Sequence, residues 1–116
     1  MMLNDYLAGW FDAVGQVFTV KKGKRHYPII RVTSKQEGIP RLFEMEFGGA
    51  VRTSNGRWIW EAARRDVVYK FATTMTSLSL LMGAVLGMVL TLQDSKDADS
   101  DAIVNGIKDL GQKGQV

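Results

Sequence analysis

The chain has 116 residues, with 15 lysines and arginines against 12 aspartates and glutamates and a formal net charge of +3. This length allows one domain with a modest core, and the absence of cysteine excludes a disulfide framework and a thiolate metal site. Residues 1–70 carry 12 basic and 7 acidic side chains, or +5, whereas residues 71–116 carry 3 and 5, or −2. The basic first part favours a polyanionic partner such as nucleic acid.

The first predicted element is a helix that Asn4 or Asp5 can cap and that ends at Gly15, since glycine tolerates the left-handed turn after a helix. Its small residues Ala8, Gly9 and Ala13 would let another helix approach closely. A β-branched and aromatic strand, 16–20, follows at once.

A basic turn at 21–26 and a strand at 27–33 complete a hairpin, with Pro28 favouring a sheet edge or a strand start. The next helix, 37–47, has Pro40 in its first turn and ends at Gly48-Gly49. Strands at 50–53 and 57–61 flank Asn55-Gly56, a strong two-residue hairpin signal. Helices are expected at 65–75 and at about 80–92, and a polar tail, 94–116, with one weak amphipathic helix follows.

The uncharged run 71–92 is long enough to cross a bilayer. Five serines and threonines lie in its first half, and the strongly apolar part, 78–92, is shorter than a spanning helix requires. Two buried helices separated near Ser77 to Ser79 are therefore favoured over a membrane span. The N-terminus lacks a basic region followed by an apolar run, so we expect a cytoplasmic or nucleoid-associated protein that is not secreted.

Helices and hairpins thus alternate in the order αββαββα, with short connections throughout. This order predicts an α+β fold with an antiparallel four-stranded sheet and helices on one of its faces.

The stretch Leu7-Ala8-Gly9-Trp10-Phe11-Asp12-Ala13-Val14-Gly15 resembles the signature helix of the LAGLIDADG homing endonucleases. The later stretches 47–52 and 60–67 are similar to the middle and end of a one-motif member, and the similarity covers a domain of about residues 1–93. The resemblance implies a homodimer in which two signature helices pack at a two-fold axis and two saddle-shaped sheets bind double-stranded DNA. The implied dimer interface consists of Leu7, Ala8, Gly9, Trp10 and Phe11.

A β-ribbon can enter the major groove, where alternate side chains then face bases and phosphates. Arginine could read guanine and glutamine adenine, whereas lysine would more often contact phosphate. The same strand alternation puts Phe18 and Val20 on that face, which makes it less polar than most groove-reading surfaces. The candidate DNA contacts are Gln16, Lys22, Lys24, Arg25, Tyr27, Arg31, Arg52, Ser54 and Arg57.

In the family, the acid before the final glycine of the signature holds a divalent metal, and here that position is Val14. The family's lysine near the start of the last helix is also missing from 71–92. We therefore expect no cofactor and no cleavage. Asp12 is a weak substitute, about 200° away around the helix. Two alternatives stay open: an Mg²⁺-dependent endonuclease that uses another acid such as Asp12 or Glu61, and a small membrane or protein-scaffold role.

Overall fold

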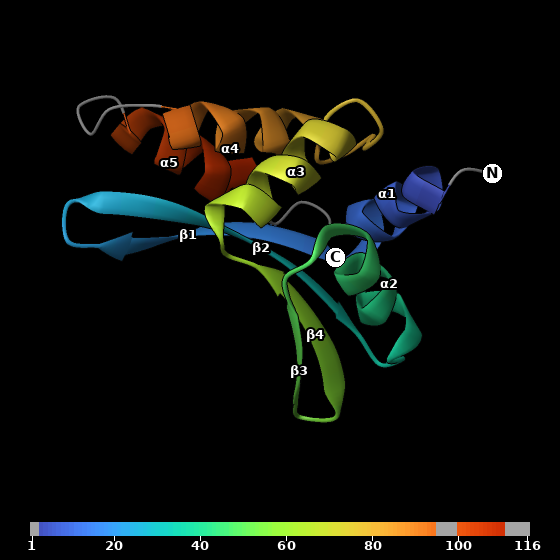
Figure 1. Cartoon of the computed structure of the whole chain (residues 1–116). Coiled ribbons are helices and arrows are strands. Elements are labelled where there is room, and N and C mark those ends of the chain that lie inside the picture. The colour runs from blue at the N-terminus through green and yellow to red at the C-terminus, as the bar shows by residue number, and fades with distance from the viewer. Residues whose placement is uncertain (1–2, 95–99, 111–116) are drawn as a thin grey trace.

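The computed structural model describes residues 3–94 and 100–110, and Figure 1 gives their arrangement. Helices cover one side of a curved sheet, and the two β-hairpins diverge from the centre of the molecule (Figure 1). This is the αββαββα order expected from the sequence, followed by two further helices. The elements in order are α1 (Leu3–Val14), β1 (Gly15–Lys22), β2 (Arg25–Ser34), α2 (Gly38–Phe47), β3 (Ala50–Ser54), β4 (Arg57–Ala62), α3 (Arg65–Met75), α4 (Gly83–Asp94) and α5 (Ser100–Leu110).

The sheet has the strand order β1-β2-β4-β3, and every neighbouring pair is antiparallel. The β3–β4 hairpin turns at Asn55 and Gly56, whose φ angles of 52° and 75° are both positive, as a two-residue type I′ turn requires. The β1–β2 hairpin is longer than expected, because pairing continues to Lys22↔Arg25. The predicted six-residue basic turn is therefore a two-residue turn.

Pro28 lies within β2, which is an inner strand, and not at a strand start. Its partner is Thr19 of β1, and pairing of β2 with β4 begins only at Ile30↔Ala62. Because pairs in an antiparallel ladder alternate and Lys22↔Arg25 next to the two-residue turn is hydrogen-bonded, Thr19↔Pro28 is a non-hydrogen-bonded pair. The nitrogen of Pro28 therefore points to the side where no strand lies, and its missing N–H costs no ladder hydrogen bond.

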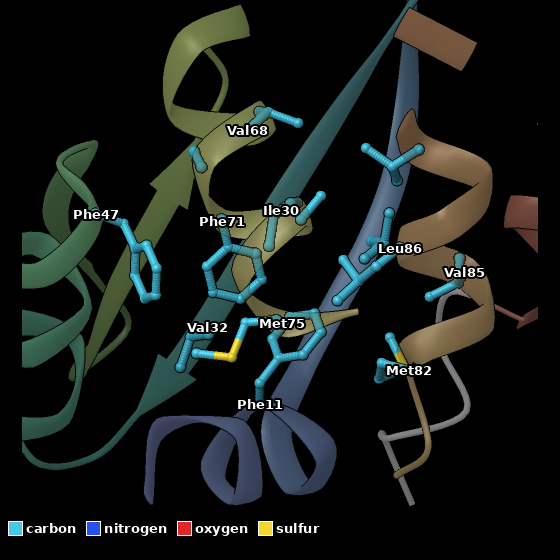
Figure 2. Packing of buried hydrophobic residues seen from close by; sticks show 14 of the residues in the cluster. Phe11, Ile30, Val32, Phe47, Val68, Phe71, Met75, Met82, Val85 and Leu86 are labelled. Carbon is cyan, nitrogen blue, oxygen red and sulfur yellow. The ribbon is translucent and has the colours of Figure 1, made fainter. Parts of the chain in front are cut away.

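The core lies between the sheet and the helices and is rich in aromatic rings (Figure 2). Phe71 of α3 is central to it, with its ring centroid 4.9 Å from that of Phe11 and 4.8 Å from that of Phe47. Trp60 of β4 is fully buried, and its indole N–H donates to the Gly48 carbonyl at 2.7 Å. The only polar atom of this large ring is thus satisfied inside the core.

The apolar run after β4 forms two helices, as predicted: α3 ends at Met75 and α4 begins at Gly83. The expected start of α4 near Leu80 is too early. The backbone N–H groups of residues 80–82 donate to the carboxylate of Asp12 in α1, so this segment forms a loop before Gly83. In the described parts of the chain, no helix combines the length and apolar character that a membrane span requires.

The helix expected in the tail is present as α5, and it is better packed than a weak amphipathic pattern indicated. Val104 and Ile107 are buried in the common core, and α5 contacts both α4 and β1. The other parts of the predicted polar tail, 95–99 and 111–116, lie outside the described residues.

Candidate nucleic-acid interface

One face of the sheet points away from the helices, and we call it the outer face. The pairs Val17↔Ile30 and Val32↔Trp60 are buried on the helix side, so the residues between them in each strand point to the other side. All predicted DNA contacts that belong to strands share this outer face, and Lys24 lies in the turn between β1 and β2. The strand residues concerned are Gln16, Lys22, Arg25, Tyr27, Arg31, Arg52, Ser54 and Arg57.

Four of the six cationic residues on the outer face and its turn lie at the two hairpin tips. Lys22, Lys24 and Arg25 are exposed at the β1–β2 tip, and Arg57 is exposed at the β3–β4 tip. The two tips lie at separate extremities of the molecule (Figure 1). The part between them includes the half-buried Phe18, as the strand alternation predicted. The tips are therefore the places where an extended polyanion would meet exposed cations.

The centre of the outer face holds an ion-pair cluster around Glu61 of β4. Arg31, its direct partner on β2, donates from Nε to Glu61 Oε2 at 2.7 Å and from Nη2 to the same oxygen. Arg52 of β3 donates from Nε to Glu61 Oε1 at 3.4 Å. The guanidinium carbon of Arg31 also lies 4.7 Å from the centroid of the Phe18 ring. Two of the predicted DNA-reading arginines thus share one carboxylate.

Helix α1 turns two different faces to its surroundings. Leu7 and Phe11 are fully buried and Ala8 is 2% exposed, and all three belong to the chain's own core. In the single chain these three predicted interface residues therefore have almost no free surface to offer to a second copy. Only Gly9 and Trp10 of the five predicted residues reach the opposite face.

That opposite face of α1 carries a shallow depression of about 390 Å³, lined by Asp5, Tyr6, Gly9, Trp10 and Ala13. Gly9 lies in the middle of it, and a Cβ built at Gly9 would meet no atom within 4 Å. Tyr6 is 40% exposed on the same side. Nothing inside the chain therefore requires a glycine at this position, although glycine costs about 1 kcal/mol in a helix interior.

The last turn of α1 holds the loop that leads into α4. The carboxylate of Asp12 accepts hydrogen bonds from the backbone N–H groups of Leu80 at 2.8 Å, Leu81 at 3.2 Å and Met82 at 3.3 Å, and from the Ser79 hydroxyl. Asp12 therefore stabilises this loop through its hydrogen bonds. The neighbouring Val14 is half-buried and packs against the core.

Comparison with solved structures finds homing endonucleases over nearly the whole chain. I-CvuI in complex with its target superposes with a TM-score of 0.72 at 16% identity, over 92% of this chain and 80% of that chain. I-TnaI superposes with a TM-score of 0.70 at 12% identity, over 97% of this chain and 88% of that chain.

The chain has the homing-endonuclease fold. The archaeal intron-encoded I-Vdi141I, complexed with DNA, agrees with a TM-score of 0.64 at 11% identity, over 92% of this chain and 95% of that chain. The LAGLIDADG homing endonuclease I-GzeII, in complex with its DNA target, has a TM-score of 0.63 at 12% identity, and this chain covers 42% of it. No family model matches the sequence, and no curated protein matches it.

Within the homing-endonuclease fold, the resemblance of the signature helix puts the metal-holding acid at position 14, where this chain has valine. A valine side chain has no oxygen to offer to Mg²⁺, which takes oxygen ligands at short range. Val14, at the end of α1, therefore offers a divalent metal no ligand at this position.

Two features of this interface were missed from the sequence. The double pairing of Glu61 depends on the β2–β4 register, which no local pattern fixes. The buried side of α1 had a usable signal, because Leu7 and Phe11 are the large apolar pair at i and i+4, the spacing of a core-facing stripe.

Proposed function

We propose that this protein is a homodimer that binds double-stranded DNA on the outer faces of its two sheets and does not cleave it. The observation that carries the proposal is the outer face itself: in this fold it is left open by the helices, and the exposed Lys22, Lys24, Arg25 and Arg57 lie at its two hairpin tips. Structural neighbours such as I-CvuI and I-Vdi141I were solved with DNA, which supports DNA as the ligand here.

The proposed dimer joins two copies of α1 through the face with the depression. A two-fold interface uses the same patch on both copies, so the patch must be self-complementary. The depression at Gly9 and the exposed ring of Tyr6 beside it put a hollow and a projection on the same patch, which is what such an interface needs. The hollow lets two backbones approach closely while the two Tyr6 rings cover the seam. Gly9 and Trp10 stay in the predicted interface, and Tyr6 and Ala13 replace the buried residues.

The proposed lack of cleavage rests on the end of α1. In a dimer each copy would bring one acid to a metal. The residue at position 14 therefore determines whether a metal can be held, and Val14 provides no acid. Asp12 is engaged with four hydrogen-bond donors of the loop before α4. Moving Asp12 to a metal would leave those donors without their acceptor, which costs stability.

Selection from a library of random duplexes, followed by titration of the selected duplex in EDTA, tests binding. About four phosphate contacts per copy would give a slope of log K against log salt of about −7 for the dimer. Incubation with Mg²⁺ should leave both strands intact. Absence of any selected duplex, or a binding constant independent of salt, would refute the DNA-binding proposal, and magnesium-dependent nicking would refute the non-cleaving part.

The substitution Val14→Asp asks whether only the ligand is missing. The side chain is half-buried at the end of α1, where the resemblance puts the metal. Calorimetric Mg²⁺ binding by Val14→Asp but not by the wild-type protein or by Val14→Asn is the expected result. Equal Mg²⁺ binding by all three proteins would refute this account of position 14.

A further inference from the structure

The two arginines around Glu61 are both oriented by its carboxylate, and Arg31 is held more rigidly than surface arginines usually are. Arg31 is fixed by two hydrogen bonds to Glu61 and by the Phe18 ring beneath it, and its side chain is 30% exposed. Arg52 is held more loosely, by one hydrogen bond from Nε at 3.4 Å, and its side chain is 50% exposed. Because their rotamers are already restrained, less side-chain entropy is lost when either guanidinium binds a ligand.

The atoms that bind Glu61 leave one edge of each guanidinium for another partner. Arginine has five N–H donors in a planar fork. Arg31 uses one donor on Nε and one on Nη2, and Arg52 uses one on Nε. The outer Nη1–Nη2 edge keeps donors on both nitrogens, and this edge matches the O6 and N7 acceptors of guanine in the major groove.

The same carboxylate makes the cluster a poor phosphate site. Glu61 reduces the combined charge of the two arginines to +1, and its side chain is 25% exposed, so a phosphate oxygen would approach a carboxylate as well as the cations. Phosphate contacts are thereby directed to the hairpin tips. Such contacts position a duplex but carry no sequence information, whereas contacts to base edges carry it.

We propose that Glu61 is a specificity-determining positioning residue, which aims Arg31 and Arg52 at guanine in the major groove and suppresses their binding to phosphate. This inference rests on the proposed DNA-binding function. Gln16 of β1 is the direct cross-strand partner of Arg31, which is in turn the partner of Glu61. Gln16, Arg31 and Glu61 thus form one row across β1, β2 and β4 at the centre of the outer face, and Arg52 reaches Glu61 from β3, where its own cross-strand partner is Ile59.

The test compares the wild-type protein with Glu61→Gln, which keeps the side-chain shape and removes the charge. Affinity is measured for the selected duplex, for the same duplex with each guanine pair changed to an adenine pair, and for an unrelated duplex. For at least one guanine, the wild-type protein should discriminate by about tenfold or more, the size of one bidentate arginine contact. Glu61→Gln should discriminate by less than about threefold and bind the unrelated duplex more tightly, with a salt slope steeper by about 0.9 per copy as a phosphate contact is gained.

Glu44→Gln is the matched control. Glu44 is also a half-buried carboxylate paired with an arginine, since it accepts from Arg41 Nη1 at 3.0 Å, but it belongs to α2 and not to the outer face. Hydrogen bonds from Arg41 to Glu44 and then Glu37 raise the pKa of that guanidinium above its ordinary value, so this pair is also closely engaged. Glu44→Gln makes the same change in net charge and should leave both discrimination and salt slope unchanged.

A second probe tests the atom that is read. Replacement of the discriminated guanine by 7-deazaguanine removes the N7 acceptor and keeps Watson–Crick pairing. It should weaken wild-type binding several-fold and have little effect on Glu61→Gln. If thermal unfolding shows that Glu61→Gln is not folded, Glu61→Asp takes its place, because it keeps the charge and withdraws the carboxylate by one methylene. The measured quantity is again the ratio of the affinities for the guanine duplex and the adenine duplex.

The outcomes separate this inference from the function on which it rests. If the wild-type protein selects no duplex from the random library, both the DNA-binding function and the role of Glu61 are overturned. A wild-type protein that binds DNA, but whose guanine discrimination survives in Glu61→Gln or is lost equally in Glu44→Gln, would overturn only the role of Glu61.

Discussion

Replacement of Gly9 by leucine should have opposite effects on the stability of the monomer and on the stability of the proposed dimer. A Cβ at Gly9 meets nothing within 4 Å in the monomer. The Cβ of a new side chain therefore clashes with nothing in the isolated chain, and the exposed position leaves the rest of a leucine room in solvent. Leucine is about 1 kcal/mol better than glycine in a helix interior, so the monomer should be stabilised by about that amount, or about 4 °C in Tm for a chain of this size.

The dimer should respond in the opposite direction. Two leucines, one from each copy, would occupy the space through which the two α1 backbones approach. Overpacking of this kind costs about 1–3 kcal/mol for each inserted side chain. For the pair this is about 3 kcal/mol or more, which is a loss of at least about a hundredfold in the dimerisation constant.

The assay is sedimentation velocity over a range of protein concentrations. Gly87→Leu is the matched control, because Gly87 is also inside a helix, α4, and a Cβ there also meets nothing within 4 Å. It should gain the same helix stability and leave the dimerisation constant unchanged. Equal dimerisation of Gly9→Leu and Gly87→Leu would refute the packing of α1 against its copy.

Three further predictions concern the fold that supports the interface. Asp12→Ala should lower the free energy of unfolding by about 3 kcal/mol, because it leaves several N–H donors unpaired. Relative to the wild-type protein, hydrogen exchange should become faster in the loop before α4 than in the rest of the chain. An equal change along the whole chain would contradict the role of Asp12. Gly49→Ala should destabilise the fold by more than about 3 kcal/mol, since the φ of Gly49 is +85° and a Cβ there would lie 2.6 Å from the Glu61 carbonyl oxygen. Gly56→Ala should cost only about 1 kcal/mol, because Gly56 has a φ of +75° but open surroundings. Equal losses of stability in chemical denaturation would count against this contrast. Ile107→Ala should cost about 3 kcal/mol because the side chain is fully buried, and an unchanged denaturation midpoint would show that α5 is not part of the core.

Much of the architecture could be predicted because local signals were strong. Asn55-Gly56 predicted the second hairpin, and the alternation of side chains in β4 puts Trp58 and Trp60 on one face and Arg57 and Glu61 on the other. The residues of the outer face followed from this alternation, since the side-chain period of a strand is two.

The parts that could not be predicted depend on contacts between distant segments. The start of α4 was misplaced, because Leu80 to Met82 donate to Asp12, 68–70 residues earlier in the chain. The burial of Ile107 depends on where α5 meets β1. The sharing of Glu61 by two arginines depends on register across three strands.

The buried side of α1 was misread for a different reason. The small residues Ala8, Gly9 and Ala13 together predict a contact surface for another helix, yet Ala8 and Gly9 are neighbours in sequence and differ by 100° around the axis. Ala8 packs inside the chain, and Gly9 is exposed. A helical wheel centred on Leu7 and Phe11 separates them.

The central claim is that two copies of this chain hold one duplex and leave it intact. The most direct measurement is the native mass of the complex with the selected duplex, taken before and after incubation with Mg²⁺. We predict a mass of two chains plus one duplex in both cases, with both strands uncut. A complex with a single chain, no complex at all, or a duplex cut after Mg²⁺ is added would contradict the account.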